Sequence, residues 1–330
     1  MMKAAVARAG AGIDAVTIEQ LPIPVPGPAE ALVRLKAATL NFRDLLGVHG
    51  LLHGAKASGY VPLSCGAGEV VAVGDGVTRV KPGDRVSPLF SQGWLSGPTT
   101  TMAMLGASVD GTAREYAAFD AQSLCLIPDE VGDLDAATLP CAGLTAWSAL
   151  FGERPLRAGE WILVQGTGGV SLAALQWAKA IGANVVATSS SDAKLHRAKA
   201  LGADITINYR TTPDWAAAAR AALGGRGVDI VVDVVGTSEL PSCASVLAED
   251  GIIAAVGRLD GTSSRGMQIG RRLVSITVGN REGHEAVLAF CARHGIRPVV
   301  DMVYDLDRLP SAMRRLESGQ FFGKLGINLM

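Results

Sequence analysis

Residues 161–183 read WILVQGTGGVSLAALQWAKAIGA, and this stretch decides the fold. A short apolar run, residues 161–165, is followed at once by a glycine-rich turn and then by an Ala- and Leu-rich segment of helical period. Gly166, Gly168 and Ser171 occupy the three marked positions of the pattern G-x-G-x-x-G, with serine in place of the third glycine. Strand, turn and helix in this order predict a dinucleotide site, with a pyrophosphate on the helix N-terminus.

The turn itself supplies the first candidate cofactor-binding residues. Gly166 permits a tight turn, and Gly168 lets the backbone approach the pyrophosphate closely. The hydroxyl of Ser171 is a further candidate contact to a phosphate. The predicted contacts of the turn are Gly166, Thr167, Gly168, Gly169 and Val170.

The chain on either side of the turn changes in pattern. Residues 1–125 contain short β-type runs separated by Gly and Pro turns, such as PVPGP and KPGDRV. From residue 161 onward, β-branched runs at 184–188, 204–207, 228–234 and 251–256 alternate with helical segments. Alternation of this kind predicts an α/β fold with a doubly wound parallel sheet, preceded by a β-rich domain.

Composition excludes several classes of function. The 330 residues carry a formal net charge of -1, which favours neither nucleic acid nor an anionic membrane surface. No apolar run reaches the roughly 18 residues of a membrane span, and the first residues lack a signal-peptide pattern, so a cytoplasmic location is expected. The five cysteines contain no C-x-x-C pair, which argues against a disulfide framework or a four-cysteine zinc site.

The end of the second predicted strand bears on the choice of dinucleotide. An NAD site typically has a carboxylate there, about 20 residues after the glycines. This strand instead ends in Ser189 and Ser190, with Lys194 nearby, and hydroxyls with a cation suit a 2′-phosphate. NADP(H) is therefore the predicted cofactor, with Tyr209 as a candidate wall on the adenine side. Asp192 is the counter-evidence, although we expect it in the first turn of the following helix.

Two later strands also end in candidate residues. Val256 and Gly257 follow one strand, and Val278 and Asn280 follow the next apolar run. Because ligands of an open α/β sheet bind at the carboxyl ends of its strands, these residues are predicted to line the nicotinamide.

Several motifs along almost the whole chain resemble one known family. They are LNFRDLLGVHG, GAGEVVAVGDGVTRVKPGDRV, LPCAGLTAWSAL, the glycine-rich turn, KALGAD and GKLGINL. The chain thus resembles the medium-chain dehydrogenase/reductase superfamily, and most closely its zinc-lacking, quinone-oxidoreductase-like branch. The resemblance implies a GroES-like catalytic domain over residues 1–125, completed by about 300–330, and a Rossmann domain over 126–299, with the active site between them. It also implies a homodimer through the edge strand LVSITVG. Within the family motifs, Thr145 and Lys324 complete the candidate cofactor-binding set.

The resemblance also locates the positions where zinc-dependent members hold their catalytic metal. Asn41 stands at the first ligand position, Ser64 at that of the histidine, Cys65 at that of the acid, and Cys141 at that of the last cysteine. An amide and a hydroxyl are poor zinc ligands, so no metal is predicted. A two-sulfur site formed by Cys65 and Cys141, with a nearby histidine, is the less favoured alternative. Without a visible cation or histidine to lower its pKa, Cys65 is interpreted as a packing thiol.

These inferences lead to a predicted activity. Without a metal, reduction of an electron-poor quinone or α,β-unsaturated carbonyl is less demanding than oxidation of an alcohol. Asn41 is the candidate catalytic hydrogen-bond donor, with a turn-forming role as the alternative. Phe90, Trp94 and Leu95 are candidate walls of the substrate pocket, with core packing as the alternative. The competing functions are an alcohol or aldehyde dehydrogenase of the same superfamily and a catalytically silent NADPH-binding protein.

Overall fold

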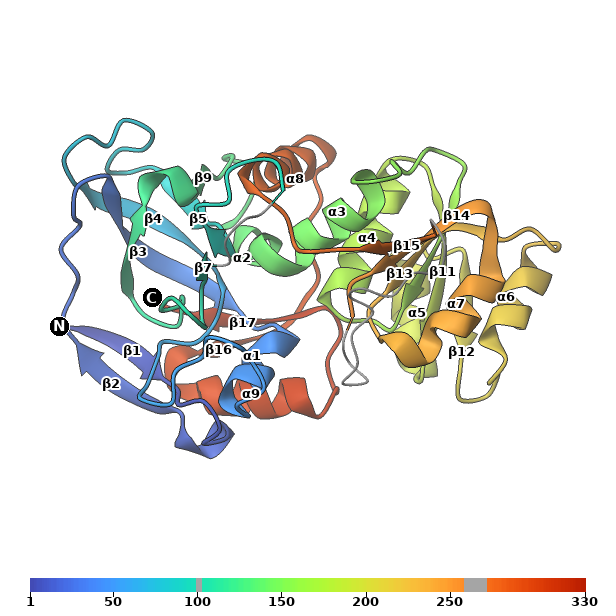
Figure 1. The fold of residues 1–330 in the computed structure, drawn as a ribbon, viewed down its shortest axis with the longest axis horizontal. Helices are drawn as coiled ribbons and strands as arrows, with labels where there is room; N and C mark the ends of the chain where they lie inside the picture. The colour runs from blue at the N-terminus through green and yellow to red at the C-terminus, as the bar shows by residue number, and fades with distance from the viewer. Residues whose placement is uncertain (99–102, 258–271) are drawn as a thin grey trace. The chain divides into compact units, whose positions relative to one another are not determined.

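The computed structural model describes residues 1–98, 103–257 and 272–330 (Figure 1). The chain forms two compact units: the first comprises Met1–Leu144 and Gly279–Met330, and the second comprises Thr145–Val278. The sequence predicts limits at residues 125 and 299, whereas the units divide at 144 and 278. The first unit gains these residues because α8 (Arg281–His294) packs against β9 (Leu124–Leu126) and the π-helical segment η3 (Leu139–Gly143).

A seven-stranded sheet is the framework of the first unit. Its order is β16-β17-β3-β4-β5-β9, with β8 paired to β3, while β1 with β2 and β6 with β7 form two small sheets. The C-terminal strand β17 pairs antiparallel with β3, with Gly326 opposite Thr39. The strands are β1 (Met2–Val6), β2 (Thr17–Leu21), β3 (Glu30–Thr39), β4 (Cys65–Val73), β5 (Arg85–Pro88), β6 (Ser91–Gln92), β7 (Ala103–Met104), β8 (Tyr116–Asp120), β9, β16 (Val300–Asp305) and β17 (Lys324–Asn328).

Short helices pack around this sheet. In α9 (Leu309–Glu317), the buried residues Leu309, Ala312, Met313 and Leu316 recur at helical spacing, so one face enters the core of the unit. The other helical elements of this unit are α1 (Phe42–Val48), α2 (Asp133–Ala137), η1 (Ile13–Ala15), η2 (Ala121–Ser123) and η5 (Leu306–Arg308).

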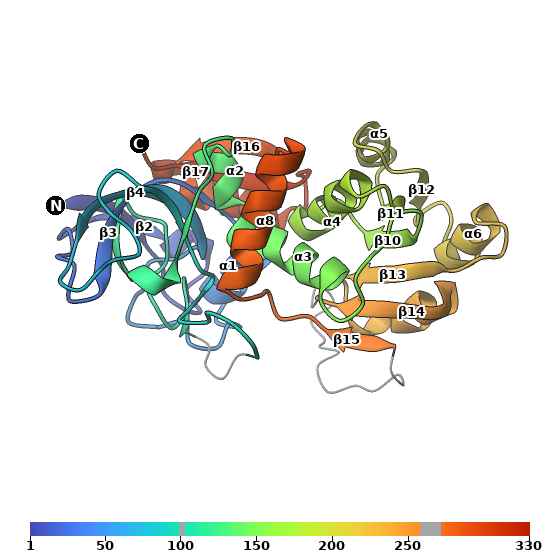
Figure 2. The ribbon, with the colours of Figure 1, turned by 90° about the horizontal axis from the view of Figure 1, so that it is seen from above.

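The second unit contains a six-stranded parallel sheet of order β12-β11-β10-β13-β14-β15. Helices α6 and α7 bury apolar side chains against one face, and α4 and α5 lie along the other (Figures 1 and 2). This is the doubly wound arrangement that the sequence predicts. Its elements are α3 (Leu144–Phe151), β10 (Trp161–Gln165), α4 (Gly169–Ala180), β11 (Asn184–Ser189), α5 (Asp192–Ala200), β12 (Ile205–Asn208), α6 (Trp215–Ala222), β13 (Val228–Asp233), η4 (Thr237–Glu239), α7 (Leu240–Val246), β14 (Leu247–Ala255) and β15 (Leu273–Ser275).

Within the described ranges, none of the helices combines the length and the apolar character needed to cross a membrane.

Candidate active site

The glycine-rich turn joins β10 to α4 in the second unit. Gly166 has a φ of +70°, which side chains strongly disfavour, and Gly168 is the N-cap of α4. A Cβ atom built on either glycine meets no atom within 4 Å, so the space beside the turn is open. The first N–H groups of a helix lack helical partners and favour an anion. The turn therefore fits the pyrophosphate of a dinucleotide, and Thr167, Gly169 and Val170 complete it.

Ser171 takes a different role from the one considered from sequence. Its buried hydroxyl donates a hydrogen bond to the carbonyl oxygen of Gln165 at 2.7 Å. The serine thus ties α4 to the end of β10, and its proton is already engaged by the protein.

The end of β11 carries the serines that predict NADP(H). Ser189 is buried, and its hydroxyl accepts a hydrogen bond from the backbone N–H of Ser191 at 3.3 Å. Ser190 is half-buried and follows the strand directly. Ser191 then caps α5 by accepting from the backbone N–H of Lys194. Ser190 is therefore the better placed of the two predicted serines to meet a ribose substituent.

Asp192 is the first residue of α5, which confirms its expected place in the first turn. Its carboxylate accepts a hydrogen bond from the Asn208 side chain at 2.7 Å. Tyr209 follows β12, and 43% of the residue's surface is exposed. The neighbourhood of β11 thus presents hydroxyls at the strand end and holds its acidic group on the adjacent helix.

The ends of β13 and β14 are joined by backbone hydrogen bonds. The N–H groups of Val256 and Gly257 both donate to the carbonyl oxygen of Asp233, at 2.8 and 2.9 Å. A Cβ on Gly257 would lie 1.8 Å from the carbonyl carbon of Val234, so this close approach requires glycine. Several candidates of the second unit therefore lie at the carboxyl edge of one parallel sheet, where such sheets bind ligands: Gly166, Thr167, Gly168, Gly169, Val170, Ser189, Ser190, Lys194, Tyr209, Val256 and Gly257.

Three further cofactor candidates, Thr145, Val278 and Asn280, lie close in sequence to the residues at which the two units divide. Thr145 is buried in α3. Val278 has a φ of +23°, and its carbonyl oxygen accepts a hydrogen bond from the Ser148 hydroxyl. Asn280 belongs to the first unit and caps α8, where its side-chain oxygen accepts from the N–H of Gly283 at 3.0 Å. A contact between Asn280 and nicotinamide stays a prediction.

A second group of candidate residues gathers where β3, β4 and β17 meet in the first unit. The side-chain nitrogen of Asn41 donates to Cys65 Sγ at 3.0 Å and to Ser64 Oγ at 3.2 Å. The ammonium of Lys324 donates to Asn41 Oδ1 at 2.6 Å and to the carbonyl oxygen of Leu40. These residues are buried. We call Asn41, Ser64, Cys65, Cys141 and Lys324 the amide–thiol cluster.

The sheet explains how distant residues reach this cluster. Thr39 lies opposite Cys65 in the β3–β4 register, and its hydroxyl donates to the carbonyl oxygen of Ala137 at 2.8 Å. This bond fixes the end of α2, and η3 with Cys141 follows directly. On the other side, Leu63 adopts a φ of +68°, and Thr112 holds the turn by donating to the carbonyl oxygens of Leu63 and Cys65.

The two thiols of the cluster influence each other's titration in opposite directions. Burial alone would raise the pKa of Cys65, but the Cys141 thiol, the charge of Lys324 and the Asn41 amide together lower it. The neighbouring Cys65 thiol, and then burial, raise the pKa of Cys141. The interpretation of Cys65 as a thiol without a cation is therefore wrong, because Lys324 arrives from the C-terminal strand.

The hydrogen bonds of Asn41 bear on its predicted catalytic role. Both amide hydrogens have protein acceptors, namely Ser64 and Cys65. Direct donation to a substrate oxygen therefore requires one of these bonds to be released. The backbone N–H of Asn41 also donates to the Asp44 carboxylate at 2.7 Å, which fixes the start of α1. Burial raises the pKa of Asp44, while Arg43 opposes this shift.

Of the predicted pocket residues, Phe90 lies between β5 and β6, and Trp94 and Leu95 follow β6. The Arg43 guanidinium stands 4.8 Å from the ring centroid of the buried Phe90, and it also donates to the carbonyl oxygen of Leu105. Trp94 and Leu95 are half-buried, and the Trp94 indole donates to the carbonyl oxygen of Gly97. Phe90 thus packs against the segment that carries Asn41.

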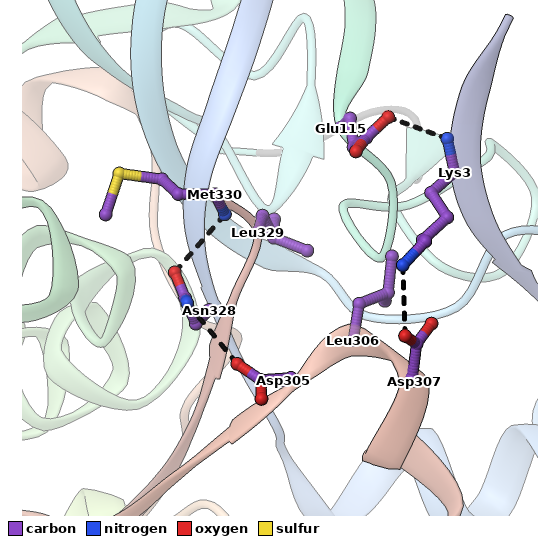
Figure 3. Close-up of a pocket in the computed structure, with 8 residues that line it drawn as sticks. All are labelled: Lys3, Glu115, Asp305, Leu306, Asp307, Asn328, Leu329 and Met330. Carbon is purple, nitrogen blue, oxygen red and sulfur yellow. Dashed lines mark hydrogen bonds and ion pairs between the residues drawn. The ribbon is translucent and has the colours of Figure 1, made fainter.

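A separate pocket of the first unit contains none of the predicted site residues (Figure 3). Its polar groups largely satisfy one another: the Lys3 ammonium donates to Asp307, the Lys3 backbone N–H donates to Glu115, and the Asn328 side chain donates to Asp305. It is lined by Lys3, Glu115, Asp305, Leu306, Asp307, Asn328, Leu329 and Met330.

The donor atoms of the amide–thiol cluster do not match a zinc site. Two thiols stand beside an amide and a hydroxyl, and the Lys324 ammonium places a positive charge next to them. Across residues 1–98, 103–257 and 272–330, no three His, Cys, Asp or Glu side chains are grouped so that they could hold a metal ion. Zinc prefers four ligands drawn from thiolate, imidazole and carboxylate, so the residues present fit this metal poorly.

Comparison with known proteins decides the family. Residues 27–129 match the alcohol dehydrogenase GroES-like domain family, and residues 169–293 match the zinc-binding dehydrogenase family. A zinc-type alcohol dehydrogenase-like protein of Schizosaccharomyces pombe is 39% identical over 96% of both chains. The chain belongs to the medium-chain dehydrogenase/reductase superfamily. The predicted fold, a GroES-like domain with a Rossmann-type sheet, is thereby confirmed.

Two solved structures represent different branches of this superfamily. An NAD-dependent alcohol dehydrogenase is 33% identical over the full length of both chains, with a TM-score of 0.89. A quinone oxidoreductase of Pseudomonas syringae is 28% identical over 99% of this chain and all of the other, with a TM-score of 0.84. The chain is thus an oxidoreductase of a superfamily that uses nicotinamide cofactors, and the relatives carry alcohol dehydrogenase names more often than quinone reductase names.

Proposed function

We propose that this chain is an NADP(H)-dependent oxidoreductase that reduces a quinone or an α,β-unsaturated carbonyl without a catalytic metal. The observation that carries the proposal is the donor set of the amide–thiol cluster, in which a lysine, an amide and a hydroxyl stand beside two thiols. Without a Lewis acid, lowering the pKa of an alcohol is difficult, whereas a conjugated acceptor is already electron-poor. Bound NADPH supplies the hydride.

The chain's own residues have defined parts in this proposal. The turn Gly166–Val170 binds the pyrophosphate, and the hydroxyls at the end of β11 receive the ribose. Asn41 is polarised by Lys324 at its oxygen, which strengthens its amide hydrogens as donors. In the structure, one of these hydrogens is donated to the Cys65 sulfur, where it favours negative charge. If one of the Asn41 hydrogen bonds is broken, the freed hydrogen could stabilise negative charge on a substrate oxygen.

A second candidate is an alcohol or aldehyde dehydrogenase, which the names of the relatives favour. This activity requires a metal or another group that activates the hydroxyl of the alcohol. The third candidate is a protein that binds NADPH without catalysing a reaction. A homodimer through the edge strand β15 and a cytoplasmic location remain predictions from sequence.

The discriminating experiment measures turnover and metal content on the same preparation. We expect NADPH oxidation with quinones or enones at zinc far below one atom per chain. Stoichiometric zinc with alcohol oxidation would favour the second candidate, and NADPH binding without turnover of quinones, enones, aldehydes or alcohols would favour the third.

Ser190→Asp tests the choice of dinucleotide. A carboxylate at this half-buried position would repel a 2′-phosphate and accept hydrogen bonds from a ribose hydroxyl. We expect the ratio of kcat/KM for NADPH to that for NADH to fall by about 100-fold, which corresponds to ~2.7 kcal/mol. Ser242→Asp, on the helix α7, is the control and should leave the ratio unchanged. An unchanged ratio in Ser190→Asp would remove the basis for NADP(H).

A further inference from the structure

We propose that Asn208 is a positioning residue for the choice of dinucleotide: it holds the carboxylate of Asp192 on the β12 side, away from the place that the ribose substituent takes beside Ser190. The inference rests on the proposed binding of NADP(H) and deepens it. It gives a part in cofactor specificity to a residue outside both the glycine-rich turn and the serines of β11.

A carboxylate stands close in the chain to the proposed 2′-phosphate. Asp192 comes only two residues after Ser190, because Ser191 caps α5 and Asp192 is the first residue of this helix. A carboxylate at the end of this strand is the group that receives a ribose hydroxyl in NAD sites, and it repels a 2′-phosphate. An NADP(H) site at Ser190 therefore requires that the carboxylate of Asp192 be directed elsewhere.

The strand register brings Asn208 to this acid. Strands β11 and β12 are parallel with Ser189 opposite Asn208, and the backbone N–H of Tyr209 donates to the carbonyl oxygen of Ser189 at 3.1 Å. The carboxyl ends of the two strands therefore lie side by side, next to the start of α5. The side-chain nitrogen of Asn208 donates to Asp192 Oδ1 at 2.7 Å, a short distance that is typical of a charged acceptor.

The orientation of the Asn208 amide is fixed at its other end. The backbone N–H of Arg210 donates to Asn208 Oδ1 at 3.0 Å. A flipped amide would place its NH2 group against this N–H and its carbonyl oxygen against the carboxylate, so both contacts would become repulsive. An amide side chain is thus required at this position, because it accepts from Arg210 and donates to Asp192 at the same time.

The contact decides which way the acid faces, and it leaves the acid charged. Asp192 stays at the N-terminus of α5, where the helix dipole favours a carboxylate. While Asp192 Oδ1 accepts from Asn208, this oxygen is not available to a ribose hydroxyl, and the carboxylate is kept next to β12. The half-buried Ser190 is then left to meet the ribose substituent.

The test measures the Kd for NADPH and for NADH by calorimetric titration of the full chain, without turnover. In Asn208→Ala the acid is released, and we expect the ratio of the Kd for NADH to that for NADPH to fall by about 10-fold relative to the wild type. In the Asp192→Asn background, the same substitution should change this ratio by less than about 2-fold, because no carboxylate remains to be positioned.

Asn184→Ala is the matched control. It removes the same amide at the opposite end of β11, where Asn184 donates to the carbonyl oxygen of Gly159 at 3.2 Å, and it should leave the ratio unchanged. An equal loss of affinity for both dinucleotides in Asn208→Ala, or an equal fall of the ratio in both backgrounds, would indicate a merely structural role and overturn the inference.

The wild type separates this inference from the proposed function. A wild type that binds NADH as tightly as NADPH would contradict the proposed cofactor and the inference together. A wild type that prefers NADPH, with an unchanged ratio in Asn208→Ala, would overturn the inference alone.

Discussion

Replacing Gly168 by alanine is expected to abolish most dinucleotide binding while the fold stays intact. Gly168 has a φ of -81°, which alanine adopts without strain, and the added Cβ meets no protein atom within 4 Å. The methyl group instead occupies the open space beside the turn, where the proposed pyrophosphate approaches the backbone. The substitution therefore acts on the ligand rather than on the protein's own packing.

The size of the effect follows from the hydrogen bonds that would be lost. Hydrogen bonds to charged groups contribute roughly 1.5–3 kcal/mol each. Loss of two such bonds from the α4 N-terminus should raise the Kd for NADPH by at least about 100-fold. Calorimetric titration or quenching of protein fluorescence measures this directly.

Gly132→Ala is the matched control. Gly132 is also a helix N-cap, with φ -68° before α2, and it lies in the first unit. Each variant replaces an N-cap glycine by alanine, so the two should show similar small losses of thermal stability. Only Gly168→Ala should lose the cofactor. Equal NADPH affinity in the two variants would show that the turn does not hold the pyrophosphate.

Elements that depend on neighbouring residues could be predicted from the sequence. The run 161–165 and the turn that follows it predict a strand and a helix start, and β10 and α4 lie there. The same holds for Asp192, because a carboxylate followed by a helical pattern predicts the first turn of a helix. Strand alternation likewise predicts the parallel sheet, since the β-branched runs at 184–188, 204–207 and 228–234 are each followed by a helix.

The amide–thiol cluster could not be derived in the same way. Lys324 stands in a short C-terminal strand, and only the pairing of β17 with β3 brings its ammonium to Asn41. Cys141 reaches Cys65 through a hydrogen bond of Thr39, a residue with no motif of its own. These contacts depend on long-range register, which a pattern along the chain does not encode. The GKLGINL motif placed Lys324 in a cofactor set, but it gave no signal of a thiol partner.

Lys324→Met is expected to have the largest effect on this cluster. Methionine retains the length of the side chain but removes the ammonium that donates to Leu40 and Asn41. Two buried oxygens then lack a donor, at a cost of roughly 1–3 kcal/mol each. We expect the free energy of unfolding to fall by about 2–6 kcal/mol, measured by chemical denaturation.

The variant should also change the titration of Cys65. In the wild type, the Cys141 thiol, Lys324 and Asn41 outweigh burial and lower the pKa of Cys65, so the thiolate persists as the pH falls below the usual range of a cysteine. Without the cation, the pKa of Cys65 should rise, and the thiolate should be lost at a higher pH than in the wild type. Ultraviolet absorbance of the thiolate follows this, with Cys65→Ser identifying its contribution.

Lys36→Met separates this effect from a general loss of charge. Lys36 lies in the same sheet and pairs with the partly exposed Glu69 at 2.8 Å, so its removal leaves no fully buried group without a partner. It should leave both the stability and the thiol titration close to those of the wild type. If Lys324→Met also left the Cys65 titration unchanged, Lys324 would not be the cation that lowers the pKa of Cys65, and the shift would depend on the Cys141 thiol and the Asn41 amide.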